Sequence, residues 1–173
     1  LGTRYFVRDG LGVAMALNEF ARNTDVYAMA NYAQTVNVIG AIKTTKTAAA
    51  FETTGLMLVL YRKHFGQIPV ATTSQTPVVD AQAALLEDQK TIALAIVNPT
   101  AERQRITLNV SGVTLGERGH AWEVAGNDPM DYNEPGKPPR IELREREISN
   151  SSSLEVMPYS ATIFRFPIVQ GSN

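Results

Sequence analysis

The spacing of apolar residues changes near residue 67, and this change limits the folds that the chain can adopt. Before that point, apolar residues recur with the period of a helix. After it they alternate with polar residues, which is typical of strands with one buried face. Helices followed by strands indicate two architectural units and not repeated β-α-β units. We therefore expect an α+β chain with its helical part first.

Three helices are predicted in the first 66 residues: 11–21 with Asp9 as candidate N-cap, 25–36, and 53–65 with Gly66 as the C-cap. The Thr- and Ala-rich segment 38–52 predicts an irregular connection with at most one short strand. Three helices of about 40 residues in total are too few to bury a core of their own. We expect them to be the end of a larger helical or α/β unit.

Strand patterns fill the rest of the chain and are separated by clusters of proline and glycine. They lie at 78–86, 91–97, 103–110, 119–124, 140–147, 154–157 and 161–166. Several short strands joined by turns predict an antiparallel β-sandwich.

Composition excludes several functions. With 173 residues, 44% of them hydrophobic, the chain can bury a real core. A formal charge of −1 offers no electrostatic attraction for nucleic acid or an anionic membrane. No apolar run approaches the length of about 18 residues that a spanning helix needs. The absence of cysteine excludes thiol catalysis and thiolate metal sites. We interpret Leu1 as a boundary within a longer protein.

Three carboxamides recur every third residue in the apolar segment 25–39: Asn31, Gln34 and Asn37. On the predicted helix they would share one sector of the surface. An amide buried without a partner costs about 1–3 kcal/mol, so each needs a hydrogen bond. Sugar hydroxyls and neighbouring backbone groups can both supply it, and the residues alone leave this choice open.

Five segments together resemble family 51 glycoside hydrolases, chiefly α-L-arabinofuranosidases. The most specific is Met-Ala-Asn-Tyr-Ala-Gln-Thr-Val-Asn-Val-Ile-Gly-Ala-Ile at 29–42, which is similar to the ANxAQxVNVxxPI motif of that family. Weaker similarities lie in order at 5–20, 95–99, 131–135 and 158–166. The resemblance therefore extends over nearly the whole chain.

This resemblance implies a (β/α)8 barrel packed on a C-terminal jelly-roll-like β-sandwich. Residues 1–42 would be the last helical segment of the barrel, 43–66 a connection and helix, and 67–173 the sandwich. Both catalytic glutamates of the family lie upstream, so no catalytic residue is assigned here. Gln34 matches the glutamine that hydrogen-bonds the sugar in the −1 subsite. For Asn31 and Asn37 we expect structural roles.

The function implied by the resemblance is that of the C-terminal portion of a retaining α-L-arabinofuranosidase. Such an enzyme releases terminal arabinofuranosyl residues from arabinoxylan, arabinan or oligosaccharides, and this portion alone would be inactive. The implied partners are the upstream barrel, the sugar substrate and further copies in a homo-oligomer. We expect no cofactor, metal, nucleic acid or membrane partner. Cytoplasmic and exported locations both remain open.

Two other functions remain open. The first is an endo-β-1,4-glucanase or xylanase of the same family, because upstream barrel loops would decide the substrate. The second is a non-catalytic sandwich that binds carbohydrate or a protein partner. Such modules usually display aromatic platforms, whereas this chain has one tryptophan and 8% aromatic residues.

Other chemistry-bearing residues have simpler interpretations. Glu145 and Glu147 alternate with arginines, which predicts a solvated strand. His64 ends a predicted helix, where its ring can interact with the helix dipole. His64 and His120 are far apart in the sequence and do not have the close spacing that is typical of paired metal ligands. Trp122 lies in a strand pattern and is expected in the core.

Overall fold

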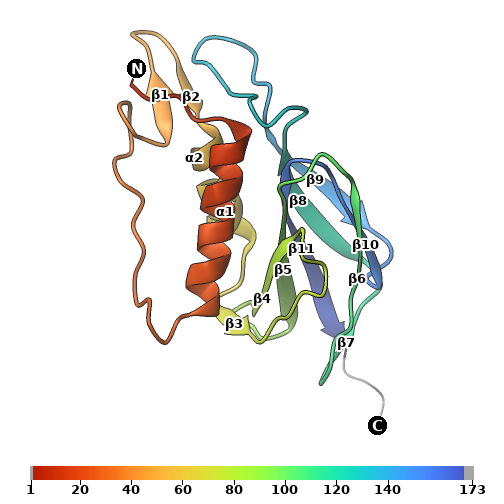
Figure 1. Cartoon of the computed structure of the whole chain (residues 1–173). Helices are drawn as coiled ribbons and strands as arrows, with labels where there is room; N and C mark the ends of the chain where they lie inside the picture. Colours follow the sequence, from red (N-terminus) through yellow and green to blue (C-terminus); the bar gives the residue numbers. More distant parts are fainter. Residues whose placement is uncertain (1, 170–173) are drawn as a thin grey trace.

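In residues 2–169, which the computed structural model describes, two helices pack on one face of a seven-stranded sheet and a two-stranded sheet packs on the other (Figure 1). The elements are α1 (Val7–Arg22), β1 (Ile42–Thr44), β2 (Ala49–Phe51), α2 (Thr53–His64), β3 (Ile68–Val70), β4 (Asp80–Leu85), β5 (Thr91–Asn98), β6 (Gln104–Thr107), β7 (Thr114–Leu115), β8 (Gly119–Ala125), β9 (Leu143–Ile148), β10 (Ser153–Val156) and β11 (Ser160–Val169).

The large sheet has the order β3-β4-β5-β11-β8-β9, and β7 pairs with the end of β11. Every pair of strands is antiparallel, including β10 with β6 and β1 with β2. This confirms the predicted antiparallel sandwich. β11 lies in the middle of the sheet, where Ile163 is opposite Ala95 on one side and Trp122 on the other.

The central strands are apolar on both faces because each face is covered by another layer. On β5, Ala93, Ala95 and Val97 belong to the core shared with the helices. Leu94 and Ile96 belong to the core shared with the two-stranded sheet. The small side chains on the helical side let α1 and α2 approach the sheet closely.

Helix α1 begins earlier than its pattern predicts. Its N-cap is Phe6, and Asp9 is the third helical residue, whose carboxylate accepts a hydrogen bond from the Phe6 N–H at 2.8 Å. Asp9 as N-cap was therefore wrong, because the apolar residues Val7 and Leu11 extend the buried face by one turn. Helix α2 confirms the third predicted helix, although its C-cap is Phe65 and not Gly66.

The predicted helix 25–36 does not form. A turn covers residues 23–26, and the chain is irregular from 27 to 35. Helices in proteins are stabilised mainly by packing an apolar face, and here Val26 and Met29 are 71% and 77% exposed. The expected irregular connection after it contains instead the β1–β2 hairpin.

A polar network connects the helices to the sheet. Asn18, which is fully buried in α1, donates to Asp80 Oδ2 of β4 at 2.7 Å and accepts from the Tyr61 hydroxyl of α2 at 2.8 Å. Arg22 also donates to Asp80, at 2.5 Å. The helical layer is thus fixed to the sandwich by polar as well as apolar contacts.

Neither helix in the described range has the length and hydropathy that crossing a bilayer requires.

Candidate functional site

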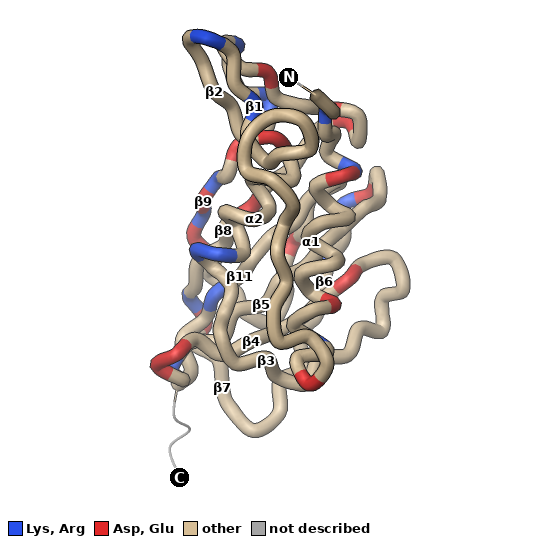
Figure 2. The backbone as a smooth tube through the Cα atoms, turned by 90° about the vertical axis from the view of Figure 1, so that its left-hand side faces the viewer, with Lys and Arg blue, Asp and Glu red and all other residues tan. Residues whose placement is uncertain are grey.

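Residues 31–40, which we call the Gln34 loop, belong to a long segment on the outer side of the helical layer, away from the large sheet (Figure 1). From residue 26 to 42 there is no Lys, Arg, Asp or Glu, and Figure 2 shows a correspondingly uncharged tube facing the viewer. Several apolar side chains here are exposed, including Val38 at 57%. The segment therefore presents several apolar side chains to its surroundings.

Gln34 is exposed in this loop, and its backbone is in the left-handed region with φ of 54°. Asn37 and Val38 also have positive φ, at 56° and 46°. Such a conformation costs about 1–3 kcal/mol for a residue other than glycine and is frequent in segments that hold ligands. The Gln34 Oε1 atom accepts a 3.4 Å hydrogen bond from the Ile39 N–H.

The three carboxamides do not share one helical sector, because the helix is absent. Asn31 is exposed. The Asn37 side chain accepts from the Thr44 N–H and donates to the Thr44 hydroxyl, both at 2.9 Å. Asn37 therefore has the expected structural role, with Thr44 of strand β1 as its partner. Gln34 keeps an exposed carboxamide and remains the candidate for contact with a ligand.

Two buried charged residues lie beneath the Gln34 loop. Lys43 is only 2% exposed. Its ammonium donates to the carbonyls of Val38 at 2.9 Å and Gly40 at 3.2 Å. Glu52 is 3% exposed and accepts from the Tyr5 N–H at 2.7 Å. Burial raises the pKa of Glu52, while the Tyr5 hydrogen bond and the Lys43 charge oppose this rise. Sequence reasoning missed both residues, and the available signal was a lysine following the apolar run that ends at Ile42.

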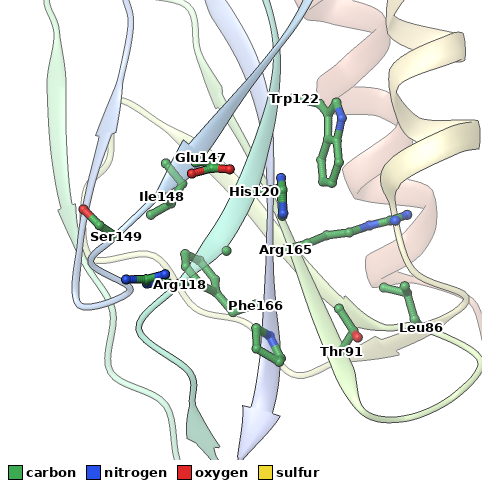
Figure 3. A pocket seen from close by; sticks show the side chains of 12 residues that line it. Leu86, Thr91, Arg118, His120, Trp122, Glu147, Ile148, Ser149, Arg165 and Phe166 are labelled. Atoms are coloured by element: carbon green, nitrogen blue, oxygen red, sulfur yellow. The ribbon is translucent and has the colours of Figure 1, made fainter.

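A hollow of about 800 Å³ lies beside β8, β9 and β11 (Figure 3). Arg118, His120 and Glu147 line it with Trp122. The Trp122 indole stacks with the His64 ring at 4.1 Å between centroids and with the His120 ring at 5.7 Å. This hollow and the Gln34 loop share no residue.

The structure agrees with the roles predicted for Glu145, Glu147 and Trp122. Glu145 and Glu147 are exposed on β9, where acidic and basic residues alternate (Figure 2). Trp122 is partly buried and packs against the core shared with the helices. Within residues 2–169, no three His, Asp or Glu side chains gather closely enough to hold a metal ion.

His64 is held in its neutral form. Its ring stacks on Trp122, and the Arg165 guanidinium donates to the carbonyls of His64 at 2.6 Å and Lys63 at 2.9 Å. Burial, followed by the positive charge of Arg165, lowers the pKa of His64 from 6.5 to about 4. Protonating this ring in the folded chain is therefore unfavourable.

Acidification should destabilise the chain through His64. Between pH 6.5 and about 4 the unfolded chain binds a proton that the folded chain does not, so the free energy of unfolding falls as pH falls. For a partly buried ring we expect a loss of about 1 kcal/mol between pH 7 and pH 5. Urea unfolding of wild type and His64→Phe, which keeps an aromatic ring against Trp122, isolates this effect. The stability difference between the two proteins should change below pH 7 and stay constant above it; a constant difference from pH 5 to 8 contradicts the assignment.

Comparison with known families identifies the relatives of the chain. Residues 1–160 match the family described as the α-L-arabinofuranosidase C-terminal domain. The chain belongs to this family. The match confirms the resemblance inferred from the motifs, and it includes α1, the Gln34 loop and the sandwich through β10.

Individual relatives of this C-terminal domain agree. The chain is 32% identical over 151 residues to a probable α-L-arabinofuranosidase C of Aspergillus flavus, a match covering 77% of this chain and 29% of that protein. Its fold is similar to a Thermotoga maritima α-L-arabinofuranosidase in complex with arabinose, with a TM-score of 0.86, 21% identity and coverage of 98% of this chain and 40% of the other. A GH51 α-L-arabinofuranosidase from Thermotoga petrophila gives a TM-score of 0.82 at 22% identity, covering 95% and 39% of the two chains. The chain thus spans about a third of the relatives that it matches.

Proposed function

We propose that the chain is the C-terminal portion of a retaining α-L-arabinofuranosidase that releases terminal arabinofuranosyl residues from arabinoxylan, arabinan or oligosaccharides. The match of residues 1–160 to the C-terminal domain family of these enzymes carries the proposal. The two glutamates, which a retaining mechanism places about 5–5.5 Å apart, would lie on the upstream part of the enzyme. The chain alone would be inactive.

In this proposal, residues 1–42 complete the upstream barrel. The exposed apolar side chains of the segment before β1 support it, because Val26, Met29 and Val38 are each more than half exposed. Exposed apolar side chains concentrated in one segment are consistent with an interface. The opposite side of the helical layer shares its core with the sandwich, so α1 would lie between the barrel and the sheet.

Gln34 would contribute to the sugar site from its exposed loop. A carboxamide offers one acceptor oxygen and two N–H donors, which suits adjacent sugar hydroxyls. Its effect would be to orient the sugar for attack by the upstream carboxylate and not to perform the chemistry. The exposed position and left-handed backbone of Gln34 support this role.

Activity of the full-length protein tests the proposal. We expect hydrolysis of 4-nitrophenyl α-L-arabinofuranoside with no release of reducing ends from carboxymethylcellulose, and no activity from the 173-residue chain alone. Activity on the glucan or on xylan main chains alone would favour the endo-acting alternative and overturn the proposal. Binding of the inactive full-length protein to insoluble xylan would favour the non-catalytic alternative.

A further inference from the structure

The Gln34 loop combines a strained backbone with a buried ammonium group. Three residues within five positions, Gln34, Asn37 and Val38, have left-handed φ. For a β-branched residue such as Val38 this conformation is a genuine outlier. Burying an ammonium among apolar atoms is unfavourable unless hydrogen bonds compensate it, so Lys43 at this depth needs an explanation.

We infer that Lys43 is a positioning residue for Gln34. Its ammonium holds the Gln34 loop in the conformation that presents the carboxamide. The inference rests on the proposed role of Gln34 at the sugar.

The contacts connect the two side chains through Ile39. Lys43 Nζ donates to the carbonyls of Val38 and Gly40, the residues on either side of Ile39. The Ile39 N–H in turn donates to Gln34 Oε1. The Val38 carbonyl and the Ile39 N–H belong to the same planar peptide group, so holding this carbonyl fixes the backbone donor that orients the carboxamide.

Neighbouring groups support the same point of the loop. The Tyr5 hydroxyl donates to the Ile39 carbonyl at 3.2 Å, and the Thr3 N–H donates to the Val38 carbonyl at 2.7 Å. The Lys43 ammonium also lies 5.3 Å from the centre of the Tyr5 ring, close enough for a cation–π contact. These contacts come from the segment before α1, so the loop is held between that segment and β1.

An apolar side chain of similar length can fill the space of Lys43 but cannot bind the two carbonyls. In the full-length enzyme, Lys43→Met should therefore lower kcat/KM by about 10- to 100-fold, as expected for a misplaced orienting group. The matched control is Lys46→Met, because Lys46 is exposed in the same hairpin. That control should have wild-type kinetics.

A double-mutant cycle separates positioning from a general structural effect. If Lys43 acts through Gln34, the variant Gln34→Ala/Lys43→Met should be no slower than Gln34→Ala, within about two-fold. The inference would be overturned if the fold-losses in kcat/KM of the two single variants multiplied in the double variant. Wild-type kinetics for Lys43→Met would also overturn it. If Lys43→Met does not fold, the same cycle with Lys43→Gln, which keeps a polar end but is too short to reach both carbonyls, decides the question.

Hydrogen exchange keeps this inference separate from the proposed function. The amides of residues 37–40 should exchange faster in Lys43→Met than in wild type or Lys46→Met, with little change in β5 and β11. Unchanged exchange in that loop would overturn the role of Lys43 even in an active enzyme. Faster exchange in a protein without arabinofuranosidase activity would overturn the proposed function and retain Lys43 as the residue that orders the loop.

Discussion

Replacing Gln34 with alanine in the full-length enzyme should lower kcat/KM by about 10- to 1000-fold without unfolding the protein. The expected loss corresponds to one to three good hydrogen bonds to the sugar. Because Gln34 is exposed and accepts only a long hydrogen bond from Ile39 within residues 2–169, its side chain contributes little to stability. Steady-state kinetics on 4-nitrophenyl α-L-arabinofuranoside, with thermal unfolding as the check on folding, measure the effect.

Gln89→Ala is a closely matched control. Gln89 is also an exposed glutamine with φ of 54°, but it lies in the turn between β4 and β5. Both substitutions place alanine at a left-handed position, so any backbone effect should be similar in the two variants. Equal kinetics for wild type and both variants would remove Gln34 from the sugar site.

Replacing Asn18 with leucine should lower the free energy of unfolding by about 2–4 kcal/mol. The substitution removes the acceptor of the Tyr61 hydroxyl and one donor to Asp80. Tyr61 is buried, so its hydroxyl would have no acceptor in place of Asn18 and would bear the cost of desolvation; the same burial raises the pKa of Tyr61 well above its ordinary value. Arg22 still donates to Asp80, which limits the loss at the carboxylate.

Urea unfolding of the 173-residue chain, followed by the fluorescence of its single tryptophan, measures this loss. Asn109→Leu is the control, since Asn109 is exposed. We expect its midpoint to stay close to that of wild type. If Asn18→Leu unfolds at the same urea concentration as Asn109→Leu, the network does not stabilise the contact between helices and sheet.

The sequence predicted the long elements and missed the short ones for a physical reason. β5 and β11 carry enough alternating or continuous apolar residues to be recognised, whereas β3 and β7 have three and two residues and depend on neighbours for their pairing. Segment 25–36 has helical spacing, but no layer covers it in residues 2–169, and its apolar side chains stay exposed. The spacing of apolar residues indicates which face of a helix could be buried. It does not show whether another part of the protein covers that face.

Of the candidate site, the sequence predicted only Gln34, which lies in the family motif. Gln34 was singled out by its match to a family segment, and its exposed position is compatible with that interpretation. Lys43 was missed because it lies between the apolar run that ends at Ile42 and the threonines that follow, a boundary at which a lysine is usually exposed. Its burial follows from the β1–β2 hairpin folding against the segment before α1, a long-range arrangement that local pattern does not contain.

The position of β11 has a consequence for biosynthesis. The ribosome makes this strand after all the others of the described range, yet β5 and β8 have no ladder between them until it arrives. A nascent chain ending before Ser160 would hold two partial sheets whose inner edges lack their shared partner, and unpaired edges promote aggregation. We therefore expect the sandwich to be completed only after β11 has left the exit tunnel of the ribosome. Chains that terminate before β11 should aggregate readily.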